Sequence, residues 1–309
     1  MSDPVVMLSH EMLARVRQPL EAAGFRVAAR WDLSDAERAA TRVIVHAGEI
    51  RLPPEFLQSL PQLGLIACVS VGYDGVDVPW CRERGIEVTH AKGLNADDVA
   101  DHAIGLVLAS WRSIVAGDRV VREGGWRNDE RVRPRPGLKG RTLGVMGLGA
   151  IGEAVAVRAE AFGMEVAWWG PNPKAARWPR ADSLLALAEA CDILVVACRA
   201  DESNRKAVSR EVIEAVGPRG LIVNVARGQV IDEDALIAAL KDGRLGRAAL
   251  DVFEQEPTPP TRWADVPNTV LTPHTAGGTV DSIPRMVAQA VENVRLFLAG
   301  EPVASPVAA

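Results

Sequence analysis

Three glycines at a fixed spacing, Gly147, Gly149 and Gly152, constrain the fold of this chain more than any other feature. They follow the apolar segment 142–146 and lead directly into the helical pattern of 153–162. In this context the first glycine allows a tight turn, the second lets the backbone approach a pyrophosphate, and the third lets the helix pack closely on the strand. The helix N-terminus then faces the phosphates. The predicted cofactor-binding residues of this dinucleotide loop are Gly147, Gly149, Ala150, Ile151 and Gly152.

Short apolar runs rich in Val and Ile alternate with longer segments of helical periodicity along the chain. Such alternation is typical of parallel βαβ units. The 309 residues agree with two domains of about 150 residues each. We therefore predict the α/β class, with two Rossmann-like, doubly wound parallel-sheet domains and a cleft between them. The predicted strands are 5–8, 26–29, 43–45, 65–70 and 87–89 in the first sheet, and 142–146, 165–169, 193–197, 221–224, 248–251 and 269–271 in the second.

The domain boundaries follow from two predicted helices. Asn95 precedes two aspartates, a pattern that favours a helix start, and the helix is predicted to continue through 99–121. The basic segment 124–137, rich in Pro and Gly, is predicted to be a loop. A last helix over 281–298 has an apolar face and is predicted to return to the first domain. The predicted parts are a substrate-binding domain at 1–94, a dinucleotide-binding domain at 95–279, and the returning helix at 280–309.

Charge and composition exclude several classes of protein. The 35 Lys and Arg against 40 Asp and Glu give a net charge of -5, so a nucleic-acid partner is not expected. The longest apolar run, 103–109, is far shorter than the roughly 18 residues of a membrane helix. The N-terminus lacks the pattern of a signal peptide, so a cytoplasmic location is expected. No metal site and no disulfide are expected from the spacing of Cys68, Cys81, Cys191 and Cys198.

Three strand ends of the second domain carry side chains that can donate a proton, orient the donor and bind an anion. His274 follows the last strand, where ligands of open α/β sheets collect. Arg227 and Glu256 follow two neighbouring strands. A carboxylate beside an imidazole favours the protonated form of the imidazole. A guanidinium can bind a carboxylate or a polarised carbonyl. Taken singly, the three residues could be a turn His, an exposed Glu and a surface Arg. The other histidines, predicted to be structural, are His10, His46, His90 and His102.

The end of the second strand of this domain bears on the choice of cofactor. An acid about 20 residues beyond the glycine loop normally binds the ribose 2′-hydroxyl of NAD. This chain has Gly170 there, followed by Asn172 and Lys174. A missing carboxylate and a nearby cation favour a 2′-phosphate, so we predict NADP, with NAD possible. An ordinary basic surface loop is the alternative.

These motifs, taken together, resemble the D-isomer-specific 2-hydroxyacid dehydrogenase family, particularly its glyoxylate/hydroxypyruvate and hydroxyphenylpyruvate reductase branch. The resemblance covers nearly the whole chain. It implies that His274 is the general acid/base, that Glu256 is its partner, and that Arg227 anchors the substrate carboxylate and carbonyl. The matching stretches are 69–74, 98–101, 147–152, 226–228, 251–257 and 272–277.

The resemblance assigns further residues to substrate and cofactor. Val71 and Gly72 match the loop whose backbone N–H groups bind the substrate carboxylate; a simple β-turn is the alternative. Val99 would line the nicotinamide side of the cleft, or belong only to the core, and Asp251 would meet the nicotinamide carboxamide. The remaining cofactor contacts are expected at Cys198, Val225, Ala226 and Gly277.

The chain departs from the family pattern at two places. Gly170 replaces the usual acid and Pro171 the NADP-type Arg, so the choice of cofactor depends on Asn172, Lys174 and Arg199. Arg199 stands in a segment that usually reads Pro-Leu-Thr; it either contacts the phosphate or is solvated.

The resemblance implies reduction of a small 2-oxo acid, of the glyoxylate or hydroxypyruvate type, to the D-2-hydroxy acid. Hydride would come from NADPH and the proton from His274. The alternatives are a reductase for larger aromatic 2-oxo acids and a non-catalytic, dinucleotide-sensing interaction protein. The family is typically dimeric, so a homodimer is expected through 99–121 and the following loop. Trp111 and Trp126 would lie near that interface, or be partly buried within one subunit.

Overall fold

The computed structural model describes residues 3–127 and 134–307. The chain forms two compact units, one from Met1–Asn95 with Gly278–Ala309 and one from Ala96–Gly277. The predicted boundaries, after 94 and after 279, lie one residue before and two residues after these limits. Residues 128–133 of the predicted loop 124–137 lie outside the described part of the chain.

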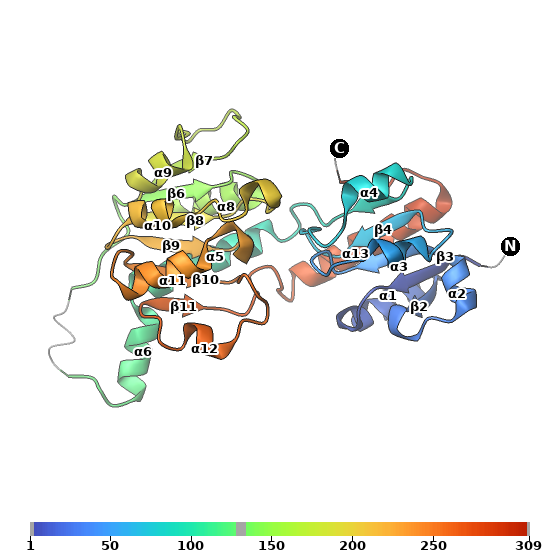
Figure 1. The fold of residues 1–309 in the computed structure, drawn as a ribbon, viewed down its shortest axis with the longest axis horizontal. Coiled ribbons are helices and arrows are strands. Elements are labelled where there is room, and N and C mark those ends of the chain that lie inside the picture. The colour runs from blue at the N-terminus through green and yellow to red at the C-terminus, as the bar shows by residue number, and fades with distance from the viewer. Residues whose placement is uncertain (1–2, 128–133, 308–309) are drawn as a thin grey trace. The chain divides into compact units, whose positions relative to one another are not determined.

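The first unit is built on a five-stranded parallel sheet in the order β2-β1-β3-β4-β5 (Figure 1). Strand β1 is buried on both faces: Val6 and Leu8 belong to one buried cluster, and Met7 between them belongs to another. This explains the continuous apolar runs, which are typical of parallel sheets covered by helices. The strands are β1 Val5–Leu8, β2 Arg26–Ala29, β3 Thr41–His46, β4 Leu65–Cys68 and β5 Glu87–Thr89, and the helices are η1 Glu11–Val16, α1 Arg17–Ala22, η2 Arg30–Asp32, α2 Asp35–Ala40, α3 Pro54–Gln58, α4 Val78–Glu83 and α13 Ser282–Ala299.

The second unit has a six-stranded parallel sheet in the order β11-β10-β9-β8-β6-β7. Strand β6 has β8 on one side and β7 on the other, so the chain order reverses there, at the point where open α/β sheets bind ligands. Helices cover both faces of this sheet, with separate buried clusters on each. The strands are β6 Thr142–Met146, β7 Glu165–Trp169, β8 Ile193–Val196, β9 Leu221–Asn224, β10 Arg247–Leu250 and β11 Thr269–Leu271, and the helices are α5 Ala96–Trp111, α6 Ile114–Arg122, α8 Ala150–Ala161, α9 Leu184–Ala190, η3 Glu202–Asn204, α10 Arg210–Val216, η4 Gly228–Val230, α11 Glu233–Lys241 and α12 Pro260–Trp263.

The prediction of one helix through 99–121 is wrong. The helix is interrupted at Ser113, which has a left-handed backbone with φ 55°, and α5 and α6 meet at a bend of 59°. Trp111 ends α5 inside the core of its own unit, where its Nε1 donates a hydrogen bond to the Gly137 carbonyl at 3.0 Å. The structure thus agrees with the alternative of burial within one subunit for Trp111, whereas Trp126 is 60% exposed.

Within the described residues, no helix is by itself long and apolar enough to cross a membrane, although α5 and α6 taken together across their bend reach the required length and composition.

A buried histidine makes the first unit sensitive to pH. His46 ends β3 with no exposed surface, and its Nδ1 lies 2.8 Å from the Ser9 hydroxyl. Burial lowers the pKa of His46 to about 4 because the charged imidazole would lose its hydration. Below pH 6.5 the unfolded chain therefore binds a proton that the folded chain excludes, and the stability of the fold falls as the pH falls towards 4.

The substitution His46→Asn removes this titrating group. We expect the loss of unfolding free energy between pH 7 and pH 5 to be smaller in the variant than in the wild type by about 2 kcal/mol. Urea unfolding at the two pH values measures the difference. His10→Asn, at an exposed histidine, is the matched control. The same loss in the wild type and in His46→Asn would contradict the assignment.

Candidate active site

The glycine loop has the backbone geometry that its spacing predicts. Gly147 has φ 95°, and a Cβ there would lie 2.4 Å from the Cys198 Cα, so no other residue fits this turn. A Cβ on Gly152 would lie 2.1 Å from the Gly147 carbonyl oxygen, which explains the close packing of α8 on β6. Gly149 caps α8 and faces open space. Ala150 and Ile151 form the first turn of α8, so the loop can present its N–H groups to a pyrophosphate.

His274 and Glu256 form the central pair of the site. Their Nδ1 and Oε2 atoms lie 2.6 Å apart, and the second Glu256 oxygen accepts the Phe253 N–H at 2.9 Å. Burial raises the pKa of the Glu256 carboxyl, but the hydrogen bonds from His274 and Phe253 and the charge of Arg227 lower it below its usual value overall. The carboxylate is therefore ionised and oriented, and it favours a protonated imidazole.

Arg227 belongs to the neighbouring loop, which a glycine brings close to the Glu256 loop. A Cβ on Gly228 would lie 1.8 Å from the Phe253 carbonyl carbon, so the two loops pack backbone against backbone. Asn224 fixes the Arg227 loop because its side chain donates to the Arg227 carbonyl at 3.0 Å and accepts the Ala226 N–H at 3.0 Å. The guanidinium Nη1 donates to the Ala226 carbonyl at 2.8 Å. A cation thus stands near the acid and imidazole pair.

A buried carboxylate organises the His274 loop. Asp251, only 1% exposed, accepts hydrogen bonds from the Thr272 hydroxyl at 2.6 Å and from the N–H groups of Thr275 and Ala276, both at 2.9 Å. Burial raises the pKa of Asp251, but these bonds and one from His102 lower it overall. The His274 N–H donates to the Asp251 carbonyl at 2.8 Å. Both the backbone and the side chain of Asp251 thus hold the loop in place.

His102 joins this network, although the sequence assigned it only a structural role. Its Nε2 lies 3.0 Å from the Thr272 hydroxyl and 3.4 Å from an Asp251 oxygen. Because the hydroxyl donates to Asp251, it accepts from His102, and Nε2 carries the proton. Thr272 is 170 positions away in the chain, so no local pattern could have indicated the contact.

The residues predicted to select the cofactor lie at the ends of β7 and β8. Gly170 follows β7 and is buried, and Asn172 is exposed. Lys174 forms an ion pair with Glu153 of α8, and Arg199 lies 3.3 Å from Asp201. Val99, Val225 and Ala226 are buried among apolar side chains, Cys198 is partly buried against Gly147, and Gly277 is the last residue of the second unit.

The first unit contains the predicted carboxylate-binding turn. His90 Nδ1 lies 2.9 Å from the Val71 carbonyl and Ser70 Oγ lies 2.7 Å from the Gly72 carbonyl, so both carbonyls are held. Across residues 3–127 and 134–307, no acceptor binds the N–H groups of Val71 and Gly72. Adjacent N–H groups of this kind can bind an anion.

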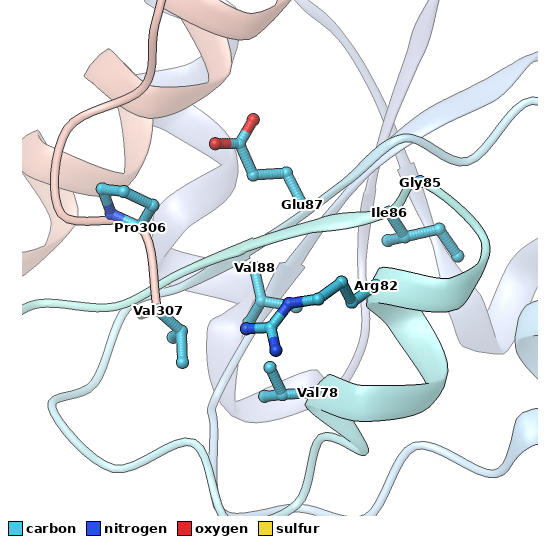
Figure 2. Close-up of a pocket in the computed structure, with 8 residues that line it drawn as sticks. All are labelled: Val78, Arg82, Gly85, Ile86, Glu87, Val88, Pro306 and Val307. Atoms are coloured by element: carbon cyan, nitrogen blue, oxygen red, sulfur yellow. The ribbon is translucent and has the colours of Figure 1, made fainter. Parts of the chain in front are cut away.

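A separate pocket of about 260 Å³ lies in the first unit between α4, β5 and the C-terminal segment (Figure 2). None of the predicted site residues lines it. In the part of the chain that the structure describes, no group of three or more His, Cys, Asp or Glu side chains could hold a metal ion.

Comparisons with known proteins identify the family of the chain. Residues 104–276 match the family described as D-isomer specific 2-hydroxyacid dehydrogenase, NAD binding domain. Hydroxyphenylpyruvate reductase from Plectranthus scutellarioides is 38% identical over 281 residues, which are 90% of this chain and 89% of that protein. A glyoxylate/hydroxypyruvate reductase from Arabidopsis thaliana is 38% identical over 270 residues, 87% of this chain and 84% of that one.

A solved structure extends the comparison to the whole fold. It is that of an NADPH-dependent glyoxylate/hydroxypyruvate reductase from Sinorhizobium meliloti in complex with NADP and malonate. The two chains are 34% identical with a TM-score of 0.91, and the match covers 99% of this chain and 97% of that one.

The pairing of Glu256 with His274 can be tested by titration. We expect Glu256→Gln to lower the pH midpoint of the His274 imidazole signal, because the variant removes the charge that favours the imidazolium. The midpoint is measured by NMR. Glu254→Gln is the matched control, since the Glu254 carboxylate lies 3.8 Å from Arg205 instead. Equal midpoints in Glu256→Gln and the wild type would contradict the pairing.

Proposed function

Because the chain belongs to the D-isomer specific 2-hydroxyacid dehydrogenase family, we propose that it reduces a small 2-oxo acid of the glyoxylate or hydroxypyruvate type to the D-2-hydroxy acid. The observation that most supports this reaction is the hydrogen bond of 2.6 Å between His274 and Glu256. A proton donor held by an ionised carboxylate is what the reduction of a carbonyl needs. The nicotinamide cofactor supplies the hydride.

Each site residue has a defined task in this reaction. His274 donates its proton to the carbonyl oxygen through Nε2, because Nδ1 is bound to Glu256. Glu256 keeps the imidazole protonated until transfer. Arg227 polarises the carbonyl and binds the carboxylate, since a guanidinium can hold two oxygens at once. The N–H groups of Val71 and Gly72 bind the same carboxylate. The cleft expected between the two domains stays a prediction.

The residues that would hold the cofactor follow the strand ends of the second unit. The open side of Gly149 and the first turn of α8 fit a pyrophosphate, because a side chain at Gly149 would occupy that space. Asp251 would meet the nicotinamide carboxamide and Val99 would line the nicotinamide side, although both side chains are buried in this structure. The remaining contacts come from Cys198, Val225, Ala226 and Gly277.

We propose that NADP is preferred over NAD. Gly170 offers no carboxylate to the ribose 2′-hydroxyl. A 2′-phosphate is therefore not repelled by a negative charge at this position. The Sinorhizobium meliloti reductase, which is NADPH-dependent, supports this preference. Asn172, Lys174 and Arg199 lie on the loops beside this position, although Lys174 would have to leave Glu153 to bind the phosphate.

A homodimer is proposed on the basis of α6. No residue of this helix is buried, and its apolar side chains Ile114, Val115 and Val121 are 55%, 45% and 57% exposed. Trp126, just beyond the helix, is 60% exposed. Exposed apolar side chains gathered on one element are typical of a protein interface.

The proposed location is the cytoplasm, where thiols stay reduced. The four cysteines are free, and burial raises the pKa of the Cys81 and Cys198 thiols to about 11, so these thiols are protonated near neutral pH.

The reaction is tested by initial rates of NADPH and NADH oxidation with glyoxylate, hydroxypyruvate, pyruvate and hydroxyphenylpyruvate. We expect turnover with a higher kcat/KM for NADPH, and a loss of rate in His274→Ala on the order of 10² to 10⁴ with NADPH binding retained. The four substrates rank the size of 2-oxo acid that the site accepts.

Two results would contradict the proposal. An unchanged rate in His274→Ala would remove this residue from the proton transfer. Tight NADPH binding without turnover on any of the four acids would favour the alternative of a dinucleotide-sensing interaction protein.

The dimer is tested by light scattering of the full chain. We expect twice the chain mass for the wild type and the mass of one chain for the double variant Ile114→Asp and Val121→Asp, because a buried unpaired carboxylate destabilises an apolar interface. Val280→Asp is the matched control at a side chain that is 88% exposed. A monomeric wild type would decide against the proposal.

A further inference from the structure

The chain that follows the loop after β7 returns to pair with β7 at the edge of the second sheet. Arg180 pairs with Trp168 of β7 in a parallel bridge. The Trp168 N–H donates to the Pro179 carbonyl at 3.0 Å, and the Ala181 N–H donates to the Trp168 carbonyl at 2.8 Å. This register fixes the backbone of Arg180 beside Trp168, which lies near the end of β7 and two residues before Gly170.

The side chain of Arg180 reaches the position where the acid of an NAD site would stand. Its Nη2 donates a hydrogen bond of 2.7 Å to the Gly170 carbonyl, and its guanidinium carbon lies 5.7 Å from the centre of the Trp168 ring. The ring is itself fixed, because Trp168 is 2% exposed and its Nε1 donates to the Trp178 carbonyl at 3.1 Å. An exposed arginine is thus held in place by one carbonyl and one aromatic face.

Arg180 differs from the other cations of these loops in its partners. Lys174 and Arg177 form ion pairs with Glu153 and Glu160 of α8. Arg199 lies 3.3 Å from Asp201. For Arg180, no carboxylate among the described residues lies within 4.0 Å of the guanidinium. Its charge is therefore the one in this group that a ligand can neutralise without breaking an ion pair first.

We propose that Arg180 binds the 2′-phosphate of NADP and is the main residue that selects NADP over NAD. This inference rests on the proposed NADP preference and names the residue that produces it. A guanidinium has five N–H donors, and one bond to Gly170 leaves others to bind two phosphate oxygens. The family pattern for NADP has an arginine at the position of Pro171. Arg180 would supply that guanidinium instead, from a segment about ten residues further along the chain.

The test measures binding of two cofactor fragments that differ only in the 2′-phosphate, adenosine 2′,5′-bisphosphate and 5′-AMP. Isothermal titration calorimetry gives Kd values for the wild type and the variants without any need for turnover. We expect Arg180→Gln to raise the Kd of the bisphosphate by about tenfold to a hundredfold, the usual cost of a lost hydrogen bond to a charged group. The Kd of 5′-AMP should stay unchanged. The matched control is Arg177→Gln, which removes a cation of the same loop that is already paired with Glu160.

A second variant tests the same site from its other side. A Cβ on Gly170 meets only the Trp168 ring, at 3.4 Å, which is an ordinary contact, so Gly170→Asp is expected to fold. Its carboxylate would pair with Arg180 and repel a phosphate. We expect Gly170→Asp, too, to raise the Kd of the bisphosphate and to leave the Kd of 5′-AMP unchanged.

The outcomes separate the inference from the proposed function. If the wild type prefers the bisphosphate and Arg180→Gln retains that preference, the assignment of Arg180 is wrong while the NADP preference stands. If Arg177→Gln weakens the bisphosphate as much as Arg180→Gln does, the general charge of the loop decides, and the assignment is also wrong. A wild type that binds both fragments equally would overturn the NADP preference and the inference with it.

Discussion

The hydrogen bonds of the buried Asp251 carboxylate determine the shape of the candidate site. A buried carboxylate is costly unless its oxygens are satisfied, and here the donors come from the chain that follows β11. The Thr272 hydroxyl and the N–H groups of Thr275 and Ala276 can all reach it only if the chain between them turns sharply. His274 stands at that turn. The position of the proposed proton donor is therefore a consequence of satisfying a buried charge next to it.

This turn has a conformational cost. His274 has φ 52°, in the left-handed region that residues with a side chain rarely adopt and that costs on the order of 1–3 kcal/mol. The hydrogen bonds to Asp251 on both sides of His274 offset the cost, and the strained backbone directs the imidazole to Glu256. His102 and Thr272 extend the network to α5, so the orientation of the imidazole depends on a helix as well as on two strands.

The sequence allowed most of the fold to be predicted, and it named His274 and Glu256, which the structure brings within 2.6 Å of each other. The physical reasons for this also explain what was missed. Strands buried on both faces are continuous apolar runs, so β1, β6 and β9 were located to the residue. The resemblance to the 2-hydroxyacid dehydrogenase family is confirmed. The break at Ser113 could not be predicted, because it depends on one backbone angle and on how Trp111 is buried. His102 and Arg180 were missed for a similar reason, since their contacts join segments whose pairing only the folded chain defines.

The carboxyl ends of the strands in the second sheet thus carry two groups of residues that depend on different forces: one follows β11 and the other follows β7. The His274 loop is fixed by buried hydrogen bonds, which tolerate little change because an unsatisfied buried group is costly. The residues around Gly170 are held by exposed ion pairs such as Lys174 with Glu153, which contribute little to stability. Exchanges among these exposed charges can therefore alter the affinity for a phosphate while the Asp251 network stays intact. If the loop after β7 selects the cofactor as proposed, a chain of this fold can change its cofactor through that loop without rebuilding the loop that holds His274.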